Sequence, residues 1–303
     1  MTQEGFLEAY EFRQKQSLPY EAKVIHAQLR AQEFYDKLEG NVFCSVGGLD
    51  SITLLIFLRK YVDKDIPGVS VSSLEDKSIQ RIHRQFENMV ILRPYKNKAQ
   101  VIREHGYPVI SKEKAGKIQL LQNPTEKNAT VRHAIMTGET GKQGGYRKGT
   151  RMRLPQKWLE LFGGPENEKY GTNYQIAPFR VSPNCCYHMK EKPCDDFAKE
   201  NKLKPYMGLM ASEGGQRQKA LMKHGCNYYG KTVTRSCPFA IFNRQDLLQL
   251  ALDLDAPVPA IYGTIERLPD GGGAFTQLKH KGPVAPCAGL VSTLKNGLIG
   301  LTG

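Results

Sequence analysis

Residues 41–58 constrain the fold of this chain more than any other stretch. An apolar run is followed by a glycine turn with Asp and Ser, and then by a second apolar run at helical spacing. Gly47 and Gly48 let the backbone approach an anion closely, and Asp50 and Ser51 fall at the start of the second run. A helix N-terminus at this point offers unpaired N–H groups and the positive end of its dipole. The pattern therefore predicts a strand, a phosphate-binding loop and a helix, with a plain tight turn as the alternative.

Further strand and helix patterns follow this stretch along the chain. The sequence predicts helices at 6–38, 75–86 and 244–254, the last with Asn243 as its N-cap, and strands at 68–71, 89–92 and 205–210. Such alternation is typical of parallel βαβ units, which bind ligands at the carboxyl ends of their strands. Ser72 is therefore expected where a nucleotide's ribose or base could be bound.

The glycine turn resembles a known nucleotide-binding loop. Gly47 to Ser51 is similar to the pyrophosphate loop (PP-loop) of the ATP-pyrophosphatase and phosphoadenosine phosphosulfate reductase superfamily, usually written Ser-Gly-Gly-x-Asp-Ser. Val46 stands where the first Ser is expected, with Ser45 one place earlier. The resemblance implies an α/β fold with a Rossmann-like parallel sheet and flanking helices (adenine nucleotide alpha hydrolase-like), followed by a helical and irregular C-terminal part.

The resemblance also implies a set of ligand-binding residues. A bound adenine nucleotide, either ATP or a sulfonucleotide, would contact Ser45, Gly47, Gly48, Leu49, Asp50 and Ser51. Residues 211–217 resemble the segment with Glu and Arg that follows a late strand in reductase-like members. Glu213 and Arg217 are therefore candidates for ribose and phosphate contacts, with an ordinary strand-to-helix loop as the alternative. Mg²⁺ is a further candidate cofactor.

Three cysteines form a second centre of interest. Cys185, Cys186 and Cys194 lie close in sequence to Lys190 and Lys192, and thiolates near cations are stabilised as ligands or nucleophiles. This pattern favours metal or iron–sulfur ligation, with a redox thiol and a buried structural role as alternatives. By resemblance, Cys185 and Cys186 would be ligands of a [4Fe–4S] cluster, and Cys194 a further one.

The C-terminal tail fits nothing that precedes it. Family members with a double Cys commonly complete their cluster with a C-terminal Cys-x-x-Cys, which this sequence does not contain. A one-base shift, with codons chosen among those permitted, yields an ending with Thr-Gly-Cys-x-x-Cys-Gly-Phe-Gly. We therefore hypothesise a frameshift between Pro269 and Phe275; a natural flexible tail with Cys287 as an ordinary thiol is the alternative. The expected domains are an N-terminal helical segment at 1–38, a nucleotide-binding domain at 39–265 with an insertion at about 106–180, and an irregular tail at 266–303.

The composition indicates where the protein is located and which partners it could bind. The 303 residues are 40% hydrophobic and 24% charged, typical of a soluble globular protein, with no stretch that could cross a membrane and no signal peptide. A cytoplasmic location is expected. The net charge of +13 favours anionic partners such as nucleotides, sulfate or nucleic acid. The basic segment 138–153 is either a nucleic-acid contact or a solvated loop.

These observations together predict an enzyme, an oxidoreductase or a transferase similar to phosphoadenosine phosphosulfate reductase. The reaction would be sulfonucleotide reduction, with an electron donor such as thioredoxin, or ATP-dependent sulfur transfer. The family's usual C-terminal Glu-Cys-Gly nucleophile motif is absent, so no catalytic residue is assigned. The alternatives are an enzyme that thiolates or otherwise modifies tRNA or DNA, and an inactive nucleotide-binding remnant. The sequence assigns neither the sulfur acceptor nor the oligomeric state.

Overall fold

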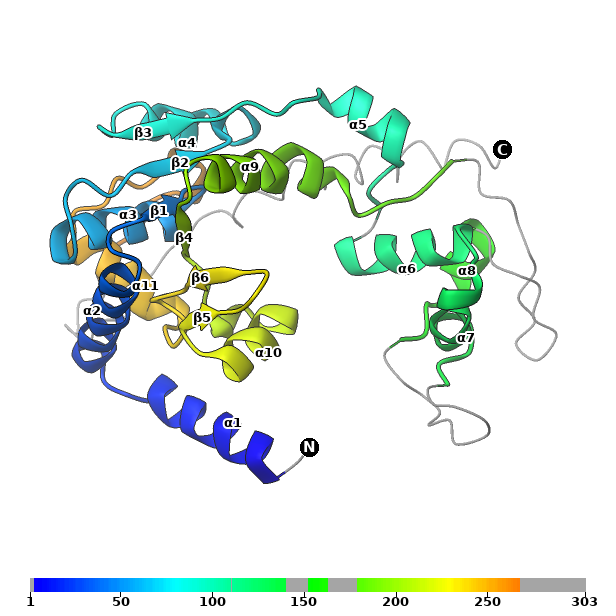
Figure 1. The fold of residues 1–303 in the computed structure, drawn as a ribbon, viewed down its shortest axis with the longest axis horizontal. Helices are drawn as coiled ribbons and strands as arrows, with labels where there is room; N and C mark the ends of the chain where they lie inside the picture. The colour runs from blue at the N-terminus through cyan, green and yellow to red at the C-terminus, as the bar shows by residue number, and fades with distance from the viewer. Residues whose placement is uncertain (1–2, 110, 140–151, 163–178, 268–303) are drawn as a thin grey trace. The chain divides into compact units, whose positions relative to one another are not determined.

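The computed structural model describes residues 3–109, 111–139, 152–162 and 179–267 (Figure 1). They divide into two compact units. The described residues up to Arg93 and from Pro193 onward form the first unit, and those between Pro94 and Lys192 form the second. The expected insertion at 106–180 lies within the second unit. Most of the basic segment 138–153 and the tail from residue 268, with the proposed frameshift and Cys287, lie outside the described residues.

The first unit is built on a mostly parallel sheet. Its strand order is β3-β2-β1-β4-β6-β5. All neighbouring strands pair in parallel except β5, which is antiparallel to β6. The strands are β1 (Val42–Ser45), β2 (Gly68–Ser70), β3 (Met89–Ile91), β4 (Lys204–Met207), β5 (Asn227–Tyr229) and β6 (Thr234–Ser236). The predicted α/β fold, with a Rossmann-like parallel sheet and flanking helices, is confirmed.

Helices connect and flank these strands, as the alternating pattern predicted. They are α1 (Gln3–Gln16), α2 (Tyr20–Lys37), α3 (Leu49–Tyr61), α4 (Lys77–His83), α9 (Lys192–Glu200), α10 (Gly215–His224) and α11 (Arg244–Asp253). Asn243 caps α11 as expected, because its side chain accepts the backbone N–H of Asp246 at 2.9 Å. Short 3₁₀ turns add η1 (Ser72–Leu74), η5 (Ala211–Glu213) and η6 (Ala260–Tyr262).

Strand β1 is buried on both faces, which explains its unbroken apolar sequence. Val42 and Cys44 belong to the main core together with Phe34 of α2. Phe43 has the opposite orientation and packs on Phe197 of α9, with ring centroids 5.9 Å apart. A strand covered by helices on both faces needs apolar side chains at every position, as in other parallel sheets.

The order of the strands creates a switch point beside β1. From β1 the chain proceeds through α3 to β2 and β3 on one side of the sheet, whereas β4 leads to β6 and β5 on the other. Ser45 at the end of β1 is in register with Met207 at the end of β4. The carboxyl ends of two parallel strands therefore meet where the topology reverses direction, the usual place for a ligand in an open α/β sheet.

The second unit is largely helical among its described residues. It contains α5 (Lys98–His105), α6 (Lys112–Gln122), η2 (Glu126–Asn128), α7 (Ala129–Thr137), α8 (Gln156–Phe162) and the π-helical turn η4 (Tyr187–Glu191). Ile118 of α6, Ile135 of α7 and Phe162 of α8 belong to its core. Helix α6 was not predicted from the sequence. Its charged residues interrupt the apolar spacing that would indicate a helix.

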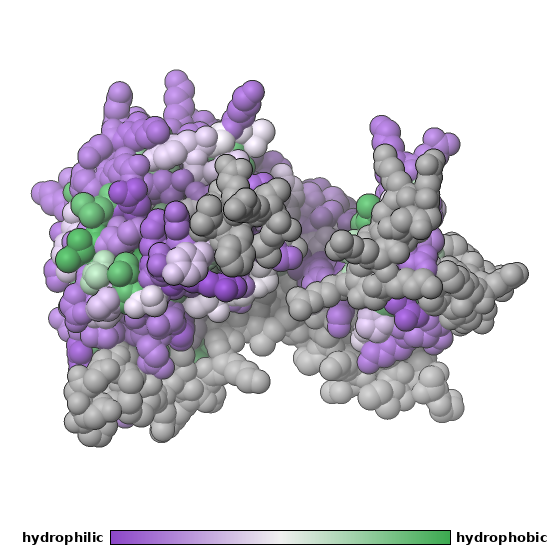
Figure 2. Space-filling view, turned by 90° about the horizontal axis from the view of Figure 1, so that it is seen from below, coloured by the Kyte–Doolittle hydropathy of each residue, from purple (hydrophilic) through white to green (hydrophobic). Residues whose placement is uncertain are grey.

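The described surface on the face shown in Figure 2 is predominantly hydrophilic. Among the described helices, none is both long enough and apolar enough to cross a membrane.

A buried ion pair joins two helices of the first unit. Lys23 Nζ of α2 lies 2.7 Å from Asp246 Oδ2 of α11, and the two side chains are 4% and 10% exposed. The same Oδ2 atom accepts the backbone N–H of Asn243 at 2.7 Å. Asp246 thus closes the capping box of α11 and anchors α2, so the two helices depend on one carboxylate.

Replacement of Lys23 by Met should lower the free energy of unfolding by about 3–5 kcal/mol, because it leaves the Asp246 carboxylate buried without its cation. Urea denaturation followed by circular dichroism measures this. The exposed Lys64 offers a matched control, and Lys64→Met should stay within about 0.5 kcal/mol of the wild type. Equal effects of the two substitutions on the free energy of unfolding would contradict the role given to the Lys23–Asp246 ion pair.

Candidate functional site

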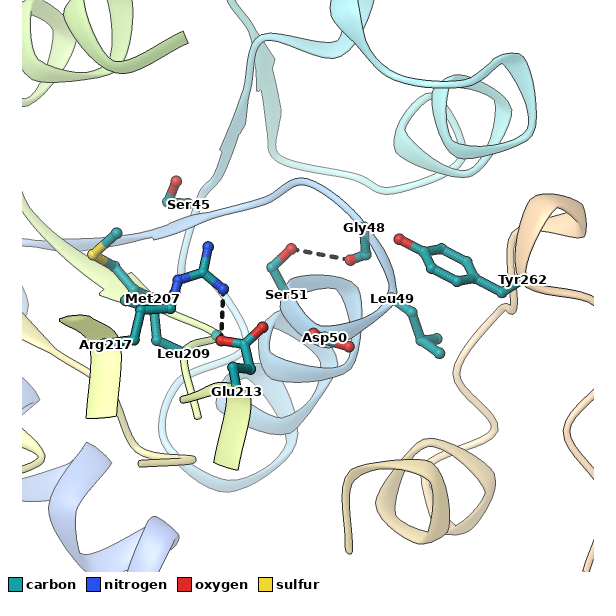
Figure 3. Close-up of a pocket in the computed structure, with 11 residues that line it drawn as sticks. Ser45, Gly48, Leu49, Asp50, Ser51, Met207, Leu209, Glu213, Arg217 and Tyr262 are labelled. Carbon is teal, nitrogen blue, oxygen red and sulfur yellow. Dashed lines mark hydrogen bonds and ion pairs between the residues drawn. The ribbon is translucent and has the colours of Figure 1, made fainter. Parts of the chain in front are cut away.

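A cavity of about 250 Å³ lies at the switch point between β1 and β4 (Figure 3). The loop after β1 and the first turn of α3 form one wall, and the segment after β4 forms another. Its lining residues are Ser45, Gly48, Leu49, Asp50, Ser51, Met207, Gly208, Leu209, Glu213, Arg217 and Tyr262. The site therefore combines a helix N-terminus, two carboxylates and a guanidinium.

The loop between β1 and α3 is closed by its own hydrogen bonds. Ser51 Oγ accepts the backbone N–H of Gly47 at 2.7 Å. The same hydroxyl donates to the carbonyl oxygen of Gly48 at 3.0 Å (Figure 3). Gly48 is the N-cap of α3 and offers no side chain to the helix. The N–H groups of the first turn of a helix have no partner within the helix, so this turn can donate hydrogen bonds to an anion in the cavity.

Tyr262 lies against the start of α3 from a distant part of the chain. Tyr262 belongs to η6, and its hydroxyl points toward Gly48 at the start of α3 (Figure 3). Burial raises the pKa of Tyr262 above its ordinary value, so the phenol stays protonated at neutral pH. A Cβ on Gly48 would lie 2.1 Å from the Tyr262 hydroxyl oxygen. Glycine at position 48 is thus needed for the tyrosine to reach the helix terminus.

Gly208, just beyond β4, is a second glycine at which two segments approach closely. A Cβ at this residue would lie 3.1 Å from backbone atoms of Asp50 and of Ser51. Backbone atoms at that distance cannot rotate away as the end of a side chain can. The absence of a side chain at Gly208 therefore lets the β4 segment pack directly on the loop, which closes this side of the cavity.

Two ion pairs balance the charges of the site. Arg244 Nη1 donates to Asp50 Oδ1 at 2.5 Å, and Arg217 Nη1 donates to Glu213 Oε2 at 2.6 Å. Burial raises the pKa of the Asp50 carboxyl, and the Arg244 guanidinium opposes that rise. The pairs are partly exposed, so each arginine could exchange its carboxylate for a phosphate oxygen.

His83 braces the loop from α4. Its Nε2 lies 2.8 Å from the carbonyl oxygen of Gly47, and its Nδ1 lies 3.0 Å from Ser72 Oγ. A carbonyl oxygen only accepts, so Nε2 carries the proton; in the neutral ring Nδ1 then accepts from the Ser72 hydroxyl. The His83 side chain is fully buried, and burial lowers its pKa. His83 thus links the end of β2 to the glycine loop.

The structure brings together most of the residues predicted from sequence. Seven of them line the cavity: Ser45, Gly48, Leu49, Asp50, Ser51, Glu213 and Arg217. Gly47 lies within the loop, and both its backbone N–H and its carbonyl oxygen are engaged by side chains. Ser72 is 5% exposed, contacts His83 and does not line the cavity.

Sequence reasoning did not assign Met207, Leu209, Tyr262, Arg244 or His83 to the site. A signal for Tyr262 was present, because residues 261–263 read Ile-Tyr-Gly, which resembles a Tyr-Gly loop of the same superfamily. For His83 and Arg244 the sequence carries no such signal. Their roles depend on contacts between segments far apart in the chain.

The three predicted metal ligands are divided between the two units. Cys185 and Cys186 belong to the second unit, and Cys194, in α9, belongs to the first. Cys185 is buried, whereas Cys186 and Cys194 are partly exposed. Within the part of the chain that the structure describes, no group of three or more His, Cys, Asp or Glu side chains is arranged to hold a metal ion. A metal cluster bound by all three cysteines therefore stays a prediction from the sequence.

No protein-family model matches the sequence, and no curated protein sequence matches it either. One solved structure to which the chain shows some similarity is that of phosphoadenylyl-sulfate (PAPS) reductase from Candida auris, in its phosphate complex. It is 11% identical with a TM-score of 0.40, and the similarity covers 82% of this chain and 96% of that one. The fold class rests on this chain's own strand order, and the site on its own side chains.

Replacement of His83 by Gln should change how stability depends on pH. The folded-state pKa of His83 lies below its ordinary value of 6.5, so the unfolded chain binds the proton more tightly. The neutral ring therefore makes its full contribution to the free energy of unfolding above pH 6.5. This contribution is lost as the pH falls below 6.5. Urea titrations from pH 5 to 8 should show a smaller loss of stability on acidification in the variant. An unchanged pH slope would contradict the buried neutral histidine.

Proposed function

We propose that this chain binds the phosphate groups of an adenine nucleotide in the cavity at the end of β1. The observation that carries the proposal is the position of the loop. A glycine turn followed by the N-terminus of α3 lies at the carboxyl ends of two adjacent parallel strands, where the topology switches direction. General α/β geometry favours anion binding there.

The charges of the site support the same proposal. The formal charges of the four ionised side chains at the site, Asp50, Glu213, Arg217 and Arg244, sum to zero. The dipole of α3 adds a partial positive charge at its N-terminus. The first-turn N–H groups of α3 would donate to phosphate oxygens. Arg217 lies beside them, and its guanidinium would bind a phosphate in place of, or together with, Glu213.

The finer proposal concerns the reaction. Sulfonucleotide reduction and ATP-dependent sulfur transfer both begin with a nucleotide held by its phosphates, and both need groups that stabilise charge on phosphate or sulfate. The lining residues include such groups. Cys44 immediately precedes Ser45, which lines the cavity. Burial raises the pKa of the Cys44 thiol far above its ordinary value, so this thiol is unsuited to act as a nucleophile. The catalytic residue stays unassigned.

The two candidate metal cofactors fit the described residues poorly. Asp50 and Glu213 are the carboxylates at the cavity, and each is paired with an arginine. They would hold Mg²⁺ only together with phosphate oxygens of the nucleotide. Among the described residues no group of three or more His, Cys, Asp or Glu side chains is arranged to hold a metal ion. We therefore assign no reaction step to either cofactor.

Calorimetric titration with ATP and with phosphoadenylyl sulfate tests the proposal. Replacement of Arg217 by Met should weaken binding of the preferred nucleotide about 10- to 100-fold, because a hydrogen bond to a charged group contributes about 1.5–3 kcal/mol. Lys219 lies on the same helix, is exposed and does not line the cavity. Lys219→Met should therefore leave the affinity unchanged.

Two results would contradict the proposal. One is that neither nucleotide binds to the full-length chain. The other is that Arg217→Met and Lys219→Met weaken binding equally, which would indicate general attraction by the net charge of +13 rather than a specific site.

That same charge favours a second candidate function, the modification of tRNA or DNA. A chain that neutralises several phosphates of a nucleic acid should lose affinity steeply with salt, by about 10³–10⁵ between 50 and 200 mM for 6–10 contacts. Electrophoretic mobility shifts with tRNA and with duplex DNA over this salt range measure the slope. Nucleotide turnover that is insensitive to salt, together with no shift of either nucleic acid, would exclude this candidate.

A further inference from the structure

The positive charge of the chain is concentrated in one stretch of the first unit. Between Gly214 and Gln245 the sequence contains six Lys or Arg residues and no Asp or Glu. This stretch forms α10, the β5–β6 hairpin and the segment that leads into α11. About a tenth of the residues thus supply nearly half of the net charge of +13. A basic face of this kind attracts a polyanion.

The basic side chains of this stretch differ in whether they are paired. Arg217 and Arg244 are paired with carboxylates at the loop cavity. Lys223, in the last turn of α10, and Lys231, in the turn of the hairpin, are exposed, and Arg235 of β6 is half-buried. In the part of the chain that the structure describes, none of these last three forms an ion pair. Their charges are therefore not neutralised within the described fold.

An aromatic ring lies among these charges. Tyr228 of β5 is directly opposite Arg235 of β6 in the antiparallel register, so the two side chains leave the hairpin on the same face. The ring of His224, at the end of α10, packs on the Tyr228 ring with centroids 4.4 Å apart. A Cβ on Gly230 would lie 2.6 Å from the Tyr228 hydroxyl oxygen, so the phenol end lies against the turn. Tyr228 is thus held at two places, yet it is only partly buried.

Helix α10 connects this ring with the loop cavity. Arg217, in its first turn, lines that cavity, and His224, its last residue, contacts Tyr228. A helix of this length, 10 residues, spans about 15 Å. Strand β5, beside β6, is the edge strand of the sheet (Figure 1). A few nucleotides of one strand would therefore extend from the loop cavity to the edge of the sheet.

We propose that the end of α10 and the β5–β6 hairpin bind a single-stranded nucleic acid. Its phosphates lie against Lys223, Lys231 and Arg235, and one unpaired base stacks on the ring of Tyr228. An acidic polypeptide would also pair with the cations, but it offers no flat base to the ring, so a nucleic acid is favoured. The proposal rests on the second candidate function given above, the modification of tRNA or DNA, and assigns the surface that holds this substrate.

Fluorescence anisotropy of labelled dodecathymidylate on the full-length chain, between about 50 and 200 mM salt, tests the proposal. Arg235→Met should lower the slope of log Kd against log salt by about 0.7, because one phosphate contact is lost. Tyr228→Leu should weaken binding about fivefold or more and leave the slope unchanged, because it removes stacking and no charge. Tyr228→Phe keeps the ring and should bind as tightly as the wild type.

The controls lie in the first unit, outside the basic stretch. Tyr61 is 38% exposed and Lys64 is exposed, and neither Tyr61→Leu nor Lys64→Met should change the affinity or the slope. Melting curves show whether each variant folds. Lys231→Met, in the exposed turn, should lower the slope as Arg235→Met does, which keeps the charge test valid if Arg235→Met does not fold.

The proposal is overturned if the oligonucleotide does not bind, if a polyglutamate peptide or a DNA duplex of the same length binds more tightly, or if Tyr228→Leu and Tyr61→Leu behave alike. Binding of tRNA that is unchanged in Tyr228→Leu and Lys231→Met would overturn this surface while the second candidate function stands. ATP binding to Tyr228→Leu should equal that of the wild type, so failure at this surface is distinct from failure at the loop cavity.

Discussion

The hydrogen bond from the Gly47 N–H to Ser51 Oγ closes the loop on which the candidate site depends. It joins the loop after β1 to the first turn of α3, and the same hydroxyl donates to the carbonyl oxygen of Gly48. A two-glycine turn would otherwise sample many backbone conformations, because glycine loses the most entropy on folding. The Ser51 side chain thus holds the glycine loop in one conformation. In this conformation the N-terminus of α3 points toward the cavity.

Segments far apart in the chain then hold this loop from outside. His83 contacts it from α4, Tyr262 from η6, and Gly208 lets β4 pack on its backbone. Arg244 neutralises Asp50 across 194 residues of sequence. Each contact is short and polar or sterically tight, so the geometry of the candidate site depends on packing across the first unit. This is the arrangement expected where a site must be formed before its ligand arrives.

The polar groups of the first unit differ in whether they are paired. At the loop cavity the arginines are already paired with carboxylates, and a highly charged phosphate would rearrange existing pairs. Elsewhere in the first unit, Arg30 Nε and Tyr229 Oη are buried without a described hydrogen-bond partner. The paired arginines of the loop cavity could exchange their carboxylates for the oxygens of a multivalent anion.

The sequence by itself determined the strand, loop and helix at residues 41–61 and the parallel α/β class, because glycine, apolar periodicity and helix caps act over a few neighbouring residues. It also predicted seven of the lining residues through a local resemblance. It did not predict α6, the place of Ser72 beside His83, or the parts played by Arg244 and Tyr262. Only the tertiary structure decided these, because they arise where the sheet brings together side chains that the chain keeps far apart.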